Sequence, residues 1–428
     1  MTTLSADADL ISLSNETGWK TAVYLSPPIP LSPGSVSNRL YYNIDFPRGH
    51  NIDFPRGHIA LKSFNGELVD ESGKPIPLTD TYLHHWVVYS YFGHISNPTP
   101  YTTDDFLDTE NIIPVRNDGF CQEDTLRHIF GLGSETRATL TDIPDPYGLE
   151  AGNPDEAPDG YEQRWVVNIH EIDTRGVVNP NGCAECWCNL FNVTRDDHDR
   201  DHHVTGRSTN NISIPGEYKG GTLCCYTNTR CAVREGFEDD EGLMRRVVYM
   251  RYTVKWVEWD ESSNSSTVVG VRSYIMDATD NGERVPGNDN IGCQVEYDVD
   301  QTCGAGVVDG GCIDTRTATG RIGRGGNIIY GLGHLHMGGL GIALYGQDGR
   351  LICESLPVYG RGKEVGNENG YVVGMSTCYP RPGSVSVADG EILRVVANYS
   401  SAVCHTGVMS HFYILVDQSR TAVNALPS

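Results

Sequence analysis

The sequence has no hydrophobic run long enough to cross a membrane and no excess of positive charge. None of its apolar stretches reaches the roughly 18–20 residues that a membrane-spanning helix needs. The 32 lysines and arginines are outnumbered by 56 aspartates and glutamates, which gives a net charge of −24. Such a charge opposes binding to nucleic acid or to anionic membranes. We therefore expect a soluble protein with no membrane span and no nucleic-acid partner.

The motifs of several large enzyme classes are also missing. The sequence contains no G-x-S-x-G nucleophile motif, no H-E-x-x-H zinc motif, no P-loop and no G-x-G-x-x-G dinucleotide motif. Acidic residues abound, but their spacing does not single out a glycosidase pair. The sequence therefore gives no support to hydrolase or nucleotide-dependent chemistry.

Long amphipathic helices are lacking as well, and strand-like segments take their place. The 48 glycines and the runs rich in Val, Tyr and Thr are typical of strands joined by tight turns. A chain of 428 residues favours two domains. We expect an all-β protein: a polar lead-in over residues 1–20, then two tandem jelly-roll-like β-sandwich domains over 21–240 and 241–428. The alternating segment from Leu243 to Trp259 is predicted to open the second domain.

The 13 cysteines bear on the compartment of the protein. A zinc ribbon needs two separated C-x-x-C pairs, and only Cys183 and Cys186 form one. Disulfides in a secreted protein are the better interpretation, with at least one cysteine left unpaired. The printed N-terminus shows neither the basic region nor the apolar core of a signal peptide. N-glycosylation sequons agree with secretion and occur at Asn15, Asn192, Asn211, Asn264 and Asn398.

Two unusual segments carry no predicted function. The octapeptide NIDFPRGH occurs at residues 43–50 and again at 51–58. An insertion of even length keeps the alternation of a strand, so the repeat needs no functional explanation. The histidine-rich segment 196–203 is interpreted as a polar surface loop rather than a metal site.

The most specific metal-binding signal is the pair His334 and His336. Residues i and i+2 of a strand point to the same side, so the two imidazoles form a chelate. Met409, inside a later hydrophobic run, could add a thioether, and this mixed set suits copper better than zinc, calcium or magnesium. Glycines on both sides of the pair leave room for a ligand or a neighbouring strand. Two alternatives stay open: Met409 as ordinary core packing, and zinc at a histidine-only site.

A second group consists of His84, His85 and His170. Adjacent residues of a regular strand face opposite sides, so His84 and His85 bind one metal ion only at a strand end or a β-bulge. On the pair alone, one buried and one exposed histidine is the simpler interpretation. Spacing does not establish His170 as a third ligand.

Taken together, these residues resemble the copper sites of the peptidylglycine α-hydroxylating and dopamine β-monooxygenases. Segment 333–349 resembles their second-copper strand pair, and 407–416 resembles the segment with their methionine ligand. Segments 83–86 and 167–170 resemble the strands with their first-copper histidines. Over nearly its whole length the chain is similar to the plant stress-up-regulated nodulin family, which carries NIDFPRGH once. The matching stretches include 51–64, 82–88, 143–148, 374–380 and 405–409.

The resemblance implies two copper ions, one in each β-sandwich, that face one another across a solvent-filled cleft. One copper would react with dioxygen, and the other would store an electron, with ascorbate as the reductant. The implied activity is hydroxylation of a C–H bond in a small molecule. The implied ligands are His334, His336 and Met409 for the copper that reacts with dioxygen, and His84, His85 and His170 for the copper that stores the electron.

This chain departs from the monooxygenase pattern at some positions, and the substrate of those enzymes is therefore not inferred for it. An arginine that grips the substrate carboxylate is replaced by Leu332, so a peptide C-terminus is not the expected substrate. An asparagine near the methionine is replaced by His411, whereas a tyrosine is kept as Tyr413. His411 and Tyr413 are the candidate catalytic residues. The alternative function is a non-catalytic, stress-associated extracellular protein that binds copper.

Overall fold

In the described part of the chain, the regular secondary structure is almost entirely β-strand, which confirms the predicted all-β class. Among the described residues, the helices are one α-helical turn and three 3₁₀ turns: α1 (Pro180–Ala184), η1 (Ser134–Arg137), η2 (Pro154–Glu156) and η3 (Cys188–Leu190). The computed structural model describes residues 18–42, 52–96, 112–115, 119, 128–191, 219–221, 224–225, 227, 229–238, 242–259, 268–280, 295–303 and 311–419.

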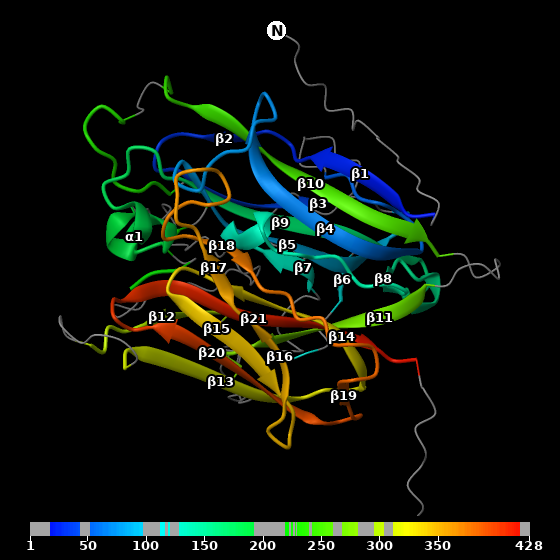
Figure 1. Cartoon of the computed structure of the whole chain (residues 1–428). Helices are drawn as coiled ribbons and strands as arrows, with labels where there is room; N and C mark the ends of the chain where they lie inside the picture. Colours follow the sequence, from blue (N-terminus) through cyan, green and yellow to red (C-terminus); the bar gives the residue numbers. More distant parts are fainter. Residues whose placement is uncertain are drawn as a thin grey trace, which may run out of the picture.

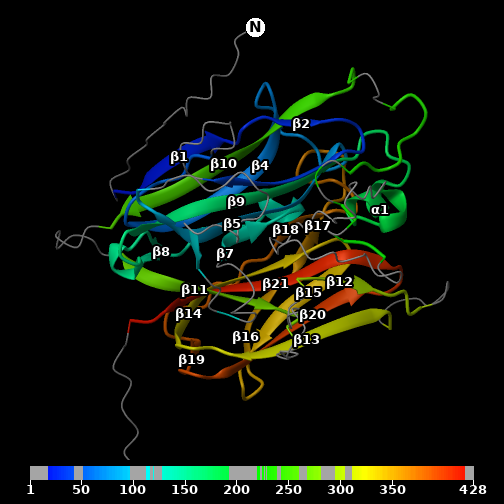
Figure 2. The same cartoon turned by 180° about the vertical axis from the view of Figure 1, so that it is seen from behind.

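The largest sheet runs through the whole molecule and has ten strands. Figure 1 and Figure 2 show its N-terminal strands on one side of the molecule and β21 and β14 on the other, with β11 between them. Its main path is β1 (Lys20–Leu25), β10 (Arg246–Glu258), β4 (Ile59–Asp70), β8 (Tyr147–Ala151), β11 (Val269–Asp277), β21 (His405–Asp417), β14 (Gly326–Leu335) and β19 (Ser386–Val387), with β2 (Ile29–Leu31) beside β10 and β12 (Glu296–Val299) beside β21.

Smaller sheets cover the two parts of this large sheet. A five-stranded sheet lies on the N-terminal part, and a four-stranded and a two-stranded sheet belong to the C-terminal part. The first contains β3 (Val36–Tyr42), β9 (Tyr161–Asp173), β5 (Thr81–His94), β6 (Ile112–Pro114) and β7 (His128–Leu132); the second contains β13 (Ile313–Arg321), β20 (Ile392–Ser400), β15 (Gly339–Tyr345) and β16 (Leu351–Ser355); the third contains β17 (Pro357–Tyr359) and β18 (Val372–Met375).

Aromatic packing joins the N-terminal layers. Phe64 of β4 and Trp86 of β5 are both buried, and their ring centroids lie 4.7 Å apart. Strands β5 and β9 are buried over most of their length, as expected for strands covered on both faces. These two strands carry His84, His85 and His170.

The C-terminal strand β14 packs closely on the four-stranded sheet. A Cβ atom at Gly333 would lie 2.3 Å from Ile342 Cγ2, so only glycine permits this approach. Because side chains alternate along a strand, His334 faces away from this contact, toward the N-terminal layers. The glycine beside the histidine pair thus makes room for a neighbouring strand, which was one of the two roles expected of it.

The large sheet crosses the expected domain boundary near residue 240. Strand β10 alternates between buried and partly exposed residues, as predicted for 243–259. It does not open a C-terminal sandwich, however, because it pairs with β1 and β4. Strand β8 also pairs in parallel with β11. The division into two domains therefore stays a prediction, and β10 belongs with the N-terminal strands.

Disulfides are present, as predicted, within the described residues. The free thiol seen there is the exposed Cys404, and Cys121 and Cys293 lie outside the described residues. The pairs are Cys183–Cys231, Cys186–Cys225, Cys188–Cys224, Cys303–Cys312 and Cys353–Cys378. Such bonds form in an oxidising, secretory-type environment. No described helix has both the length and the apolar character needed to cross a membrane.

The octapeptide repeat and the histidine-rich segment lie mostly outside the described residues. Residues 43–51 and 192–218 are not among the described residues. From the second copy of the octapeptide, Ile52 and Phe54 are buried in the core. The second copy therefore supplies packing side chains to the N-terminal layers.

A buried carboxyl group in β9 makes the stability of the fold depend on pH. Burial raises the pKa of Glu171 to about 8 from 4.5, and Ser37 and Arg39 oppose this shift in part. The native state therefore retains a proton that the unfolded chain releases near pH 4.5. Between about pH 4.5 and 8, this group lowers the free energy of unfolding as pH rises, by at most about 1.4 kcal/mol per pH unit.

We expect Glu171→Gln to remove this loss, because glutamine does not titrate, so the free energy of unfolding should change more favourably from pH 5 to pH 8 than in the wild type. Urea unfolding of the metal-free protein at pH 5 and pH 8 measures the effect. Glu354→Gln, on the exposed side of β16, is the control and should keep the wild-type dependence. Equal pH slopes for both variants would contradict the assignment to Glu171.

Candidate metal centre

A β-bulge turns His84 and His85 toward the same region. In the pairing of β5 with β9, Leu83 lies opposite Glu171 and His85 lies opposite His170, so His84 is the extra residue. A bulge of this kind interrupts the alternation of side chains. The Nδ1 atoms of His84 and His85 consequently lie 3.2 Å apart. The condition that the sequence sets for this pair, a bulge or a strand end, is met.

His170 completes a three-histidine group. Its ring stacks on that of His84 with 4.4 Å between the centroids. One ligand nitrogen from each of His84, His85 and His170 lies within 4.8 Å of the others, and all three side chains are buried. His85 Nε2 is 2.7 Å from Asn168 Oδ1, which leaves His85 Nδ1 for a metal ion.

His334 and His336 form a second group at the end of β14. Their Nε2 atoms lie 3.2 Å apart, so the two rings converge as expected for residues i and i+2 of a strand. Both residues are buried. Glu135 in η1 fixes the first ring, because its Oε1 atom is 2.5 Å from His334 Nδ1. The Gly133 N–H donates to the other carboxylate oxygen of Glu135.

The strand register, extended by one residue, predicts that Met409 lies near His336. In the antiparallel pairing of β14 with β21, His334 lies opposite His411 and Leu335 lies opposite Ser410. The observed pairing ends there; one further step of this register would bring Met409 opposite His336, and Met409, two residues before His411, points to the same side of β21 as His411. The Tyr399 hydroxyl joins the two strands there: it accepts from the His336 N–H at 2.8 Å and donates to the Met409 carbonyl at 2.7 Å.

His411 and Tyr413 follow Met409 on the same side of β21. His411 Nε2 is 3.4 Å from Asp277 Oδ2 on the neighbouring strand β11. The Tyr413 hydroxyl is 3.5 Å from Nδ1 of His128, which belongs to β7 of the five-stranded sheet. The rings of His128 and His411 are 5.9 Å apart. A third pair of buried histidines therefore extends the group along the interface between the layers.

The two predicted ligand groups meet directly. The rings of His84 and His336 lie 4.5 Å apart at nearly a right angle. Both side chains are buried, with exposed fractions of 0% and 2%. The resemblance implies a solvent-filled cleft between the two groups; at this point the two rings contact one another instead. We call the set His84, His85, His128, His170, His334, His336, Met409 and His411 the histidine cluster.

Burial keeps several of these imidazoles neutral at pH 7. It lowers the pKa of His85 to about 4. It also lowers the pKa values of His84, His128, His170 and His336 well below the ordinary value, and neighbouring histidines add to the effect. Neutral imidazole is the form that binds metals, so no proton has to be displaced.

The residues fit a bound metal ion. His84 Nε2 and His170 Nδ1 are buried and have no hydrogen-bond partner in the described structure. A buried polar atom without a partner costs about 1–3 kcal/mol, which a metal–nitrogen bond would remove. The three-histidine group alone suits copper or zinc, whereas a thioether beside two imidazoles favours copper.

Several residues around the cluster lack any local sequence signal. Glu135, His128 and Asn168 come close to the cluster only because separate strands pack together. Tyr399 belongs to β20 of the four-stranded sheet and contacts the cluster for the same reason. A glutamate in a short turn and a lone histidine are common in any sequence. Their roles depend on contacts between residues far apart in the chain, which spacing does not reveal.

Comparison with known proteins identifies the family. Residues 17–419 match the family described as Stress up-regulated Nod 19, and the chain belongs to that family. No curated protein matches it. Among solved structures, the chain is similar to the VP2 subviral particle of infectious bursal disease virus, with 10% identity, coverage of 96% of this chain and 76% of that chain, and a TM-score of 0.19. A second structure of particles derived from the same virus shows 10% identity, coverage of 95% and 72%, and a TM-score of 0.19.

We expect Glu135→Gln to weaken metal binding at His334 by about 10- to 100-fold, because an anionic acceptor no longer holds the ring. Competition with a Cu(I) chelator measures the affinity. Glu185→Gln is the matched control, since Glu185 is buried and its Oε1 atom is 2.7 Å from Nδ1 of His405, outside the cluster. Equal losses in both variants would refute a specific role for Glu135.

Proposed function

We propose that this protein is a copper-dependent monooxygenase that hydroxylates a C–H bond of a small molecule. The observation that carries the proposal is the histidine cluster, in which a two-histidine group beside a methionine adjoins a three-histidine group. Bound copper would supply one-electron redox chemistry toward dioxygen, with ascorbate as the reductant. The two groups differ in donor type, which is what two ions with different tasks require.

The side chains of the cluster have distinct roles in this proposal. His334, His336 and Met409 would hold one ion, and His84, His85 and His170 the other. Glu135 keeps the proton of His334 on Nδ1, so that Nε2 is directed to the metal. Asn168 orients His85 in the same way. Tyr399 fixes the spacing of His336 and Met409 through their main chains.

His411 and Tyr413 are the proposed catalytic residues. Asp277 lies next to the His411 imidazole, and His128 lies next to the Tyr413 hydroxyl. Both groups can hold or move a proton at the edge of the cluster. Leu332 lies opposite Tyr413 and is buried, so this position offers no cation for a substrate carboxylate. The substrate is therefore expected to be a small molecule without a carboxylate anchor at this point.

The second candidate is a stress-associated extracellular protein that binds copper without turnover. The deep burial of the ligands favours it: His84 and His170 are 0% exposed and Met409 is 6% exposed. A substrate C–H bond has to reach the metal, whereas a stored ion does not. The disulfides and the sequons support secretion under either proposal.

Oxygen consumption with ascorbate separates the two candidates. The copper-loaded wild type should bind two ions per chain and consume oxygen when ascorbate and substrate candidates are present. Two tightly bound ions without any ascorbate-dependent uptake would favour the binding protein. A preference for zinc over copper at the His334 group would refute both.

Met409→Ala tests the thioether ligand. We expect it to weaken Cu(I) binding and abolish oxygen uptake, because alanine offers no donor to the reduced ion. Met337→Ala is the control: Met337 is equally buried, at 6%, but follows His336 directly and is not placed opposite it by the register of β21. The same Cu(I) affinity in both variants would mean that Met409 serves only as core.

A further inference from the structure

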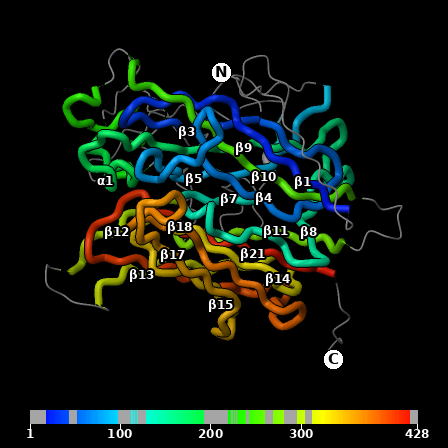
Figure 3. Tube along the Cα trace, turned by 45° about the horizontal axis from the view of Figure 1, so that its top comes forward, coloured from blue at the N-terminus to red at the C-terminus, as the bar shows by residue number. Residues whose placement is uncertain are grey.

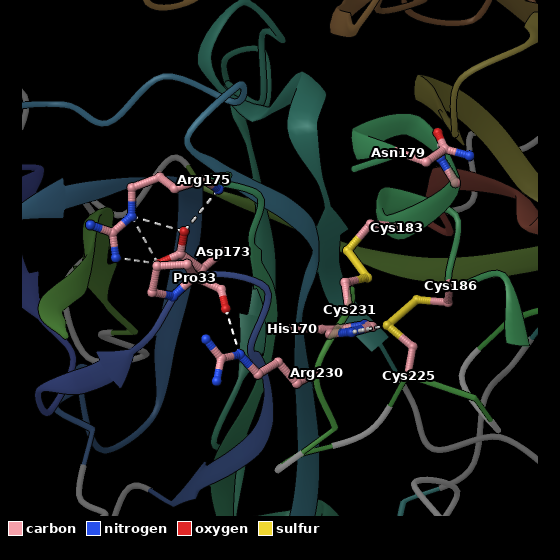
Figure 4. Close-up of a disulfide and its surroundings, with 11 residues drawn as sticks. Pro33, His170, Asp173, Arg175, Asn179, Cys183, Cys186, Cys225, Arg230 and Cys231 are labelled. Carbon is pink, nitrogen blue, oxygen red and sulfur yellow. Dashed lines mark hydrogen bonds and ion pairs between the residues drawn. A yellow bond between two sulfur atoms is a disulfide. The ribbon is translucent and has the colours of Figure 1, made fainter. Parts of the chain in front are cut away.

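The disulfide between Cys186 and Cys225 lies directly against the histidine cluster. Figure 4 shows the His170 ring directed at this disulfide, and the Cys225 sulfur is 3.5 Å from His170 Nε2. Cys186, Cys225 and His170 are all fully buried. One member of the three-histidine group therefore has two sulfur atoms as close neighbours, which the proposed copper function does not use.

These three residues have the donor set of a metal site of their own. The two sulfur atoms and one nitrogen of His170 lie within 4.8 Å of one another. In the disulfide, the sulfurs are poor ligands, because the thiolate is the form that binds metals. Two thiolates and one imidazole suit zinc or Cu(I).

The surrounding chain would hold the sulfurs in place if this bond opened. Cys186 lies between Cys183 and Cys188, and the disulfides of those two residues reach Cys231 and Cys224 on either side of Cys225. Cys186 also adopts a left-handed backbone conformation with φ of 54°, which non-glycine residues rarely do. Residues held in such conformations cluster at sites where a particular side-chain position is needed.

We propose that reduction of Cys186–Cys225 by a dithiol creates a buried metal site made of Cys186, Cys225 and His170. The dithiol supplies two electrons and two protons: the S–S bond breaks, two thiols form, and the reductant becomes a disulfide. An incoming Zn²⁺ or Cu(I) ion then displaces both thiol protons. His170 also belongs to the three-histidine group. The redox state of the disulfide therefore determines whether His170 can bind a metal ion together with Cys186 and Cys225.

Protection from alkylation in the wild-type protein tests this proposal. The full chain is treated with a graded series of dithiol concentrations, with and without Zn²⁺ after removal of the reductant, then alkylated and mapped by mass spectrometry. Where Cys186–Cys225 has opened, Zn²⁺ should abolish alkylation of both residues. Cys404 is free and exposed, so it should be alkylated equally with and without Zn²⁺ and serves as the internal control.

Two variants separate this site from the copper proposal. His170→Ala should lose the zinc protection, and His84→Ala should keep it, because His84 belongs only to the three-histidine group. Alkylation of Cys186 and Cys225 that is unaffected by Zn²⁺ overturns the proposal. So does protection that persists in His170→Ala, or a bond that opens only when circular dichroism shows that the protein has unfolded. None of these results depends on oxygen consumption, so failure of the copper function would be visible separately.

Discussion

The contact between His84 and His336 is the constraint around which the rest of the structure is arranged. It joins strands from opposite halves of the chain at a point that is closed to solvent. Polar rings rarely meet in a core unless their nitrogens are satisfied, because an unsatisfied one is costly at low dielectric. Glu135, Asn168 and Tyr399 satisfy or position part of the cluster, and a metal ion would satisfy the remainder. Figure 3 shows β5 in the N-terminal half of the molecule and β21 in the C-terminal half below it.

Local backbone features set the geometry on both sides of this contact. On the N-terminal side, the extra residue in β5 turns two consecutive histidines to one region. On the C-terminal side, Gly333 lets β14 approach the four-stranded sheet and so directs His334 and His336 to the opposite face. The bulge is a departure from a regular strand, and Gly333 permits a close approach within one; each lies next to a proposed ligand. Bulges are typical of functional sites, where the position of a side chain matters more than the regularity of a strand.

The sequence predicts the all-β fold because alternation and glycine-rich turns are local properties. It also predicts that His334 and His336 converge, since strand geometry alone requires it. It leaves His84 and His85 undecided, because a bulge depends on the partner strand and not on the two residues. The sequence also does not reveal that β10, which follows residue 240, pairs with β1 and β4, because this pairing joins residues 178 or more positions apart. His128 and Glu135 carry no local signal at all.

The family and the disulfides agree with a stress-related protein of an oxidising compartment, and the proposed copper sites would add metal chemistry to this. A copper centre beside a disulfide would be sensitive to both electron donors and thiols. The proposed oxygenase and the proposed thiolate site share His170, so the chemistry of one limits the other. Both proposed sites are buried where the N-terminal and C-terminal layers of the protein meet, and this contact brings them together.

X-ray absorption at the copper edge of the Cu(I)-loaded protein, with its disulfides intact, tests the central claim most directly. If the cluster holds two ions as proposed, the spectrum should show imidazole nitrogen ligands and one sulfur ligand for every two copper ions. That sulfur contribution should disappear in Met409→Ala and persist in Met337→Ala. A spectrum with nitrogen ligands alone in the wild type, or with sulfur that is unaffected by Met409→Ala, would contradict the mixed histidine–methionine centre.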